Sequence, residues 1–403
     1  MYSCHKNSYL HGNTDINAGI INRLVERAWD GIHFVDEYDR APPFNRLTSE
    51  QPCIPVKNVD CTRRPQGFGR WAMPKLRREL HDKDAQVILA ALTSICDLIH
   101  DPERGYEAIH LGIVERLVDH TTHELPTIRE RSTHLLKVLA ELAEGKEAIV
   151  ENPHLLANLI DNIDDEFAEV RVQTAACIEM VAAFWKTADV LVENGLIQVL
   201  LANLNDKPEV VQIHLETLKH LIYCNGKKIV IENDGFSILV KLLQRDESEI
   251  LAKTCTLLSI LCSIKEGRKL ASKEFNLLLE LNRLLHDERE LIHTAAAETI
   301  MFCTIKSAEK ITASKINSMP KRLVQLTNNR LNGRTQMFAM KALTNICEHP
   351  LVRKEVSTKY YFDIENSQLS EDIAELQKYK NTLMGMLKWV PETKDDLTAG
   401  KNY

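Results

Sequence analysis

The sequence is poor in aromatic residues, which make up 6% of it, and it contains only 15 glycines and 13 prolines. Scarce aromatic residues beside plentiful leucine, isoleucine, alanine and valine favour packed helices over β-sheets. The low glycine and proline content excludes a collagen-like chain and a chain dominated by disordered linkers. Lysine and arginine form only short clusters and the net charge is −7, so the sequence does not predict a nucleic-acid-binding protein.

The motifs of common catalytic and cofactor sites are also missing. There is no GxxxxGK[ST] phosphate loop, no strand followed by GxGxxG, no GxSxG nucleophile turn and no HExxH metal-binding helix. Residues 66–69 contain a GxG, but a turn that leads into the Met73-Pro74 pair explains it better than a phosphate-binding loop does. We therefore expect no enzyme activity, no cofactor and no small-molecule substrate.

Two histidines come closest to a metal site. His120 and His123 stand between Asp119 and Glu124, but no other cysteine or histidine accompanies them at the spacing of zinc ligands. The segment is therefore interpreted as a solvated polar turn, with a metal-binding pair as the alternative, and no metal is predicted.

The ten cysteines form no CxxC pair, and most of the later ones lie among apolar residues at helical spacing. Cys255 and Cys262, for example, fall two turns apart on one apolar stripe. This pattern predicts reduced, buried thiols and not a disulfide framework. The first residues lack the apolar core of a secretory signal, and no apolar run is long enough to span a bilayer. We expect a cytoplasmic protein that has no membrane partner.

A repeat of about 41 residues is the strongest signal in the sequence. Gly145, Gly226 and Gly267 stand in similar short motifs, each at the end of a long apolar stretch, and they are 81 and then 41 residues apart. Polar turns run in phase with these motifs, because Asp206, Asp246 and Asp287 follow one another at steps of 40 and 41 residues. Aspartate and serine in these turns are predicted to be the N-caps of the long helices that follow.

Division at these markers gives about seven repeats, 73–112, 113–153, 154–195, 196–235, 236–275, 276–317 and 318–358. Their mean length lies within the range of armadillo and HEAT repeats. We therefore predict an all-α fold in which residues 73–358 form a right-handed superhelical solenoid of armadillo/HEAT-like repeats. An ordinary globular helical protein is the alternative.

The two ends of the chain do not follow the repeat. Residues 1–72 are predicted to be an irregular N-terminal arm, with one amphipathic helix over 15–29 and a proline-rich segment over 40–65. This arm either lies along a partner or the solenoid, or is a partly ordered tail. Residues 359–403 are predicted to contain a C-terminal capping helix that starts after Ser370, carries Glu371 and Asp372 in its first turn, and precedes a frayed tail.

One repeat carries a motif that is typical of armadillo proteins. Residues 342–346 read Ala-Leu-Thr-Asn-Ile, which resembles the Ala-Leu-x-Asn-Leu pattern of the long armadillo helix, and Met73-Pro74 and Met319-Pro320 resemble the Ile-Pro that opens the preceding helix. In peptide-carrying armadillo proteins such as importin-alpha and beta-catenin, a ladder of asparagines holds the backbone of an extended peptide. The equivalent positions here, which we predict to line a partner-binding groove, are Ser94, Val138, Met180, His220, Ser259, Thr299 and Asn345. A single asparagine among them argues against an import-adaptor function, and Val138 and Met180 have core positions as an alternative.

Residues 68–80 (FGRWAMPKLRREL) and 92–103 (LTSICDLIHDPE) resemble the opening repeat of the radial spoke head 14 homologue family, also called rhabdoid tumour deletion region proteins. This resemblance implies a non-catalytic structural scaffold of the ciliary or flagellar axoneme. Its implied partners are other radial spoke subunits and axonemal proteins, and its implied location is the cytoskeleton of a cilium or flagellum. A soluble armadillo adaptor that binds a peptide segment for transport or assembly is the alternative.

Overall fold

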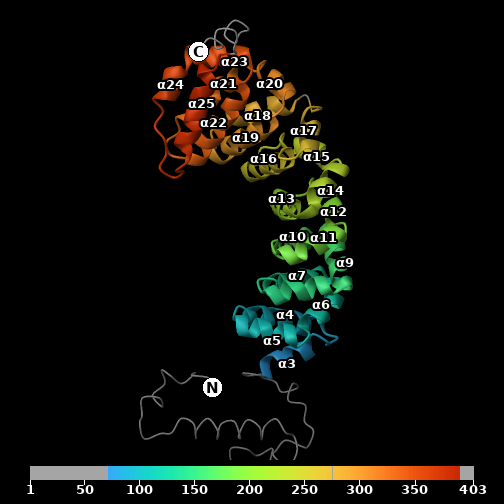
Figure 1. Ribbon diagram of the computed structural model, residues 1–403. Coiled ribbons are helices and arrows are strands. Elements are labelled where there is room, and N and C mark those ends of the chain that lie inside the picture. Colours follow the sequence, from blue (N-terminus) through green and yellow to red (C-terminus); the bar gives the residue numbers. More distant parts are fainter. Residues whose placement is uncertain (1–70, 275, 391–403) are drawn as a thin grey trace, which may run out of the picture. The chain divides into compact units, whose positions relative to one another are not determined.

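The computed structural model describes residues 71–274 and 276–390, and all the regular elements in these ranges are helices (Figure 1). The predicted helix at 15–29, the proline-rich segment at 40–65, the turn at 66–69 and the tail after residue 390 lie outside the described residues. The chain divides into two compact units, Met1–Leu98 and Ile99–Tyr403. Among the described residues, no helix combines the length and the apolar character needed to cross a lipid bilayer.

The first compact unit contains α3 (Ala72–Glu79) and all but the last residue of α4 (Ala85–Ile99). The second contains seven long helices: α7 (Pro126–Leu139), α10 (Ala168–Ala182), α13 (Pro208–Leu221), α16 (Ser248–Cys262), α19 (Glu290–Cys303), α22 (Gly333–Cys347) and α25 (Leu376–Lys388). The shorter helices that precede α7 or lie between the long helices are α5 (Pro102–His110), α6 (Ile113–Thr121), α8 (Ala143–Glu151), α9 (Pro153–Asp161), η5 (Asn162–Asp164), α11 (Trp185–Glu193), α12 (Leu196–Ala202), η6 (Ile222–Gly226), α14 (Lys227–Glu232), α15 (Gly235–Leu242), α17 (Lys265–Ala271), α18 (Leu277–Leu285), α20 (Ser307–Ala313), α21 (Ser318–Thr327), α23 (Pro350–Lys359) and α24 (Tyr361–Glu365).

The repeat predicted from the sequence is present in the second compact unit. Its long helices begin between 40 and 43 residues apart, and each one packs directly on the next, from α7 to α25. The short helices form a stack of their own, in which α5 packs on α8, α8 packs on α11, and α18 packs on α21. Each repeat therefore buries its apolar stripe against its neighbours, as expected of a solenoid.

The last long helix starts later than the sequence predicted. Ser370 does not cap it, because α25 begins at Leu376. Instead, the Ser370 backbone N–H donates to the Gln336 side chain at 2.9 Å, and its hydroxyl donates to Asp372 at 2.8 Å. The segment is thus tied to α22 as a loop, and α25 covers the exposed side of α22 in the way that the next long helix of the array would.

Prolines mark the start of several helices. Pro102, Pro126, Pro153, Pro208 and Pro350 occupy the first turn of α5, α7, α9, α13 and α23. A missing N–H costs nothing at this position, because the first-turn amides have no partner within the helix.

The expected aspartate N-caps are absent from α13 and α19. These helices, like α16, have no side-chain capping bond. The carboxylate of Asp206 accepts two hydrogen bonds from the guanidinium of Arg171, at 2.6 and 2.8 Å, and Asp287 accepts from Arg289 at 2.8 and 2.9 Å. Each carboxylate also accepts a backbone N–H of the turn itself, from Lys207 for Asp206 and from Arg289 for Asp287, so the two aspartates stabilise the turn and not the first turn of the helix.

An arginine clamp joins neighbouring repeats at these turns. Arg171 also donates to the backbone carbonyls of Asp165 and Glu166, at 2.8 and 3.2 Å. Arg129, one repeat earlier, makes the same set of bonds: two to the Asp165 carboxylate and two to the carbonyls of His123 and Glu124. Both arginines thereby link the start of their own helix to the turn before the next long helix.

The repeated glycines lie where a short helix approaches the end of a long helix. A Cβ atom on Gly145 would lie 2.0 Å from the Leu139 carbonyl oxygen, and one on Gly267 would lie 2.0 Å from that of Leu261. Gly226 is similarly close to the carbonyl oxygen of Leu221, at 2.6 Å. No side chain fits at these distances, so the glycine motif has a packing origin.

The described cysteines with placed side chains confirm the expected buried thiols, since Cys96, Cys177, Cys255, Cys262, Cys303 and Cys347 are all free and buried. Burial raises the pKa of the Cys177, Cys255 and Cys347 thiols to about 12. These groups are therefore protonated core side chains at neutral pH.

Candidate partner-binding face

The long helices of the second compact unit present one equivalent residue in each repeat. Counted twelve residues on from the first residue of α7, α10, α13, α16, α19 and α22, this position holds Val138, Met180, His220, Ile260, Phe302 and Asn345. Val138 and Ile260 are 6% and 9% exposed, and the others are half-buried. We call the surface formed by this row and its neighbours on the same helices the long-helix face.

Three of the predicted groove residues are not available to a partner. Val138, Ser259 and Thr299 are buried, the last two with 1% and 0% of their surface exposed. The Thr299 hydroxyl donates to the carbonyls of Cys255 and Ala295, at 2.8 Å each. Counted from the start of each helix, the equivalent positions are Ile260 and Phe302 instead of Ser259 and Thr299. The helix starts are 40 residues apart from α13 to α16 and 42 apart from α16 to α19, whereas the predicted positions follow steps of 39 and 40.

The other predicted groove residues are partly exposed. Met180, His220 and Asn345 lie on the long-helix face, and Ser94 lies on α4 in the first compact unit. The Asn345 side-chain amide donates to the Met301 carbonyl at 2.9 Å. One of its two N–H donors therefore joins α22 to α19, and the second N–H and the carbonyl oxygen remain for a partner.

Charged groups on the long-helix face are paired between adjacent helices. His220 Nε2 lies 3.4 Å from Glu179 Oε1 across α13 and α10, and Lys253 Nζ lies 3.5 Å from Glu216 Oε2 across α16 and α13. Farther along, Arg334 reaches Glu298 at 3.4 Å across α22 and α19. These three contacts pair a basic side chain of one long helix with a glutamate of the long helix before it.

Burial favours a higher pKa for two of these carboxylates, Glu216 and Glu298, but their cationic partners compensate it to different degrees. For Glu216, burial alone would raise the pKa, but hydrogen bonds and charge from Lys219 and Lys253 outweigh it and lower the pKa. For Glu298, burial raises the pKa, and Arg334 offsets only part of this effect. Glu298 is therefore the less well compensated of the two carboxylates.

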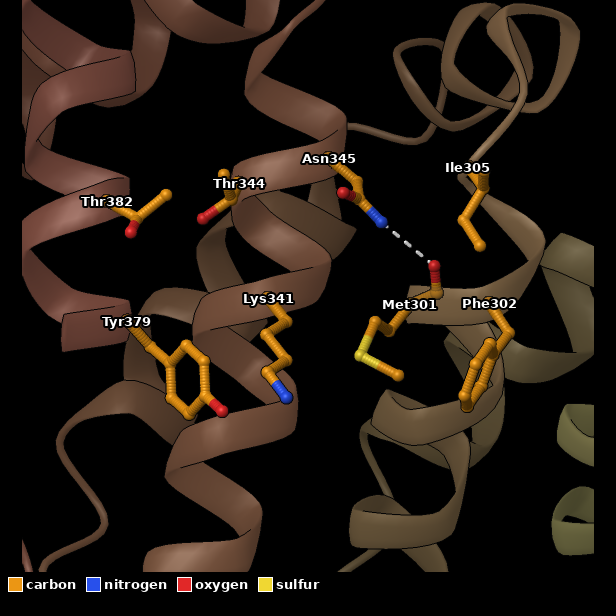
Figure 2. A pocket seen from close by; sticks show the side chains of 8 residues that line it. All are labelled: Met301, Phe302, Ile305, Lys341, Thr344, Asn345, Tyr379 and Thr382. Atoms are coloured by element: carbon orange, nitrogen blue, oxygen red, sulfur yellow. Dashed lines mark hydrogen bonds between the residues drawn. The ribbon is translucent and has the colours of Figure 1, made fainter. Parts of the chain in front are cut away.

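A pocket of about 310 Å³ opens on the long-helix face between α19, α22 and α25 (Figure 2). Its lining residues are Met301, Phe302, Ile305, Lys341, Thr344, Asn345, Tyr379 and Thr382. The apolar side chains come from the α19 side and the polar ones from α22 and α25, as the close-up shows. The Lys341 ammonium lies 4.1 Å from the centre of the Tyr379 ring.

The predicted solvated polar turn is present over 122–124, which includes His123, but it does not include His120. His120 belongs to α6 and is only 4% exposed. The Nδ1 atom of His123 accepts a hydrogen bond from the Leu125 backbone N–H at 3.0 Å, which is a local turn contact. No group of three or more metal-ligating side chains occurs within residues 71–274 and 276–390.

Comparison with known proteins identifies the fold. No family model matches the sequence. Among solved structures, a designed armadillo repeat protein is similar to this chain with a TM-score of 0.52 and 20% identity, over 57% of this chain and 99% of its own. Computationally designed armadillo repeat proteins for modular peptide recognition match with a TM-score of 0.53 and 21% identity, over 57% and 99%. A third, a designed armadillo repeat protein in complex with the peptide (KR)4, matches with a TM-score of 0.52 and 20% identity, also over 57% and 99%. The chain has the all-helical armadillo-repeat solenoid fold.

Proposed function

We propose that this protein is a non-catalytic scaffold that binds other proteins through the long-helix face. The observation that carries this proposal is the composition of that face, where accessible Met180, Phe302 and Ile305 lie among charges already paired within the protein. Apolar side chains bordered by satisfied polar groups are typical of protein–protein interfaces. The designed armadillo relatives recognise peptides, which supports the same use of the fold.

The face is suited to a folded or helical partner more than to an extended main chain. An extended peptide needs donors and acceptors for its backbone in every repeat, whereas the equivalent positions are mostly apolar and Asn345 already uses one of its two N–H donors within the protein. Helical partners satisfy their own backbone and offer rows of side chains instead.

We further propose that the scaffold serves in the radial spokes of a ciliary or flagellar axoneme, with other spoke subunits as its partners. This part rests on the sequence resemblance of residues 68–80 and 92–103. In ciliated cells, the tagged protein is expected to stay with detergent-extracted axonemes through a wash in high salt. Recovery only from the soluble cytoplasmic pool would contradict the axonemal assignment and favour the adaptor.

The binding face itself is tested by one matched pair of variants. Met180→Glu places a charge in the middle of the long-helix face, and Leu279→Glu places one on α18, where Leu279 is 54% exposed. Proteins that co-purify with the wild-type chain should be lost with Met180→Glu and kept with Leu279→Glu. Loss with Leu279→Glu alone would move the binding surface to the short helices.

A further inference from the structure

The pocket between α19, α22 and α25 breaks the charge pattern of the long-helix face. At three of the five earlier pairs of adjacent long helices, α10–α13, α13–α16 and α19–α22, a cation or histidine faces a glutamate of the adjacent helix. At the last pair, α25 offers Lys341 the ring of Tyr379 in place of a carboxylate. The described part of the chain places no carboxylate within 4.0 Å of the Lys341 ammonium.

Lys341 is nonetheless partly withdrawn from water. Burial lowers the pKa of its ammonium group, and the negative charge of Glu375 opposes this effect from a longer distance. The Glu375 carboxylate itself accepts a hydrogen bond from the Tyr379 hydroxyl at 2.6 Å. An anionic group that binds beside a partly desolvated cation without an ion-pair partner gains more binding free energy than one beside a cation that is already paired.

The opposite wall of the pocket is apolar and accessible. Met301, Phe302 and Ile305 form it, and Ile305 has 44% of its surface exposed. In Figure 2, Lys341 and Tyr379 face these three side chains across the opening. The free carbonyl oxygen of Asn345 lies at the edge between the two walls, since only its NH₂ group is bonded.

We propose that this pocket binds a protein segment in which an acidic side chain stands beside a bulky aliphatic or aromatic one. The carboxylate pairs with Lys341, and the apolar side chain packs on Phe302 and Ile305. This inference rests on the proposed scaffold function, because it names the chemistry of one partner contact on the same face. Charge complementarity selects an acidic segment, since a basic one would meet Lys341 in a poorly solvated setting.

The test uses the full-length chain and three fluorescein-labelled peptides, (Leu-Glu)5, (Leu-Lys)5 and (Ser-Glu)5, followed by fluorescence anisotropy. We expect (Leu-Glu)5 to bind at least about tenfold more tightly than either of the others, because only this peptide offers both a carboxylate for Lys341 and an apolar side chain for Phe302 and Ile305. Equal binding of (Leu-Glu)5 and (Leu-Lys)5 would overturn the proposal, as would equal binding of (Leu-Glu)5 and (Ser-Glu)5.

Variants locate the site. Lys341→Gln and the exposed Ile305→Ser should each weaken (Leu-Glu)5 binding by about tenfold, and Lys341→Glu should shift the preference towards (Leu-Lys)5. Lys321→Glu, at an exposed position on α21, is the control and should bind like the wild type. Thermal melts confirm folding, and Lys341→Gln keeps the test valid if the charge reversal unfolds the chain. Unchanged binding in both Lys341→Gln and Ile305→Ser would overturn the assignment.

The two proposals fail in different ways. If (Leu-Glu)5 binds no more tightly than the other peptides while Met180→Glu still releases the co-purifying proteins, the scaffold function stands and only the proposed pocket chemistry is wrong. Should Met180→Glu release nothing, the scaffold function of the wider face fails, whatever the peptide result.

Discussion

Replacement of Gly267 by alanine tests the packing that defines the repeat. The new Cβ would lie 2.0 Å from the Leu261 carbonyl oxygen and 2.6 Å from its carbon, both backbone atoms at the end of α16. A normal C···O contact needs about 3.3 Å, so α17 would have to move by about 1.3 Å. Alanine gains up to about 1 kcal/mol over glycine in a helix, but forced backbone shifts typically cost about 1–3 kcal/mol, and a clash with backbone atoms lies at the upper end of that range. We expect a net loss of about 2 kcal/mol in the free energy of unfolding.

Gly385 provides the matched control, because a Cβ there meets nothing within 4 Å. Gly385→Ala on α25 should therefore stabilise the protein by about 0.5–1 kcal/mol through helix propensity alone. Urea unfolding followed by circular dichroism measures both variants under the same conditions. A Gly267→Ala variant as stable as the wild type would refute the close approach of α17 to α16.

Three further predictions concern the core and the clamps. Burial lowers the pKa of His214 to about 4 from 6.5, so the unfolded chain takes up a proton first as the pH falls. Relative to His214→Leu, the wild type should therefore lose about 2 kcal/mol of unfolding free energy between pH 7.5 and pH 5. A difference between the two proteins that stays constant with pH would contradict the buried neutral imidazole. Arg171→Lys cannot keep the two-point bond to Asp206 and should cost about 1–2 kcal/mol in urea unfolding, against almost nothing for the exposed Arg131→Lys. Iodoacetamide at pH 8 should leave Cys177 and Cys255 unmodified in the native protein, as peptide mass mapping would show, and rapid labelling would contradict their burial.

The sequence was sufficient to predict the repeat because its markers have direct steric causes. Gly145 and Gly267 recur because a side chain at either position would collide with a backbone carbonyl. These glycines also predicted where the long helices end, since each one marks the point at which a short helix packs closely against the end of a long helix. Buried cysteines followed from helical spacing on the apolar stripe in the same way.

Other features depend on contacts between repeats and could not be predicted. Asp206 stands where an N-cap would, but Arg171 lies in the preceding repeat and takes its carboxylate. The long helices begin at steps that vary from 40 to 43 residues, and such small differences leave no clear mark in a divergent repeat, so the face positions Ile260 and Phe302 were missed. The pocket at Lys341 requires α25, whose start at Leu376 differs from the one that Ser370 suggested.

Hydroxyl-radical footprinting, free and with co-purified partners, tests the central claim most directly. We expect partners to protect Met180, His220 and Phe302 on the long-helix face, while Leu279 on α18 and Ile311 on α20 stay as reactive as in the free protein. Protection of Leu279 and Ile311 with unchanged labelling of the long-helix face would contradict it.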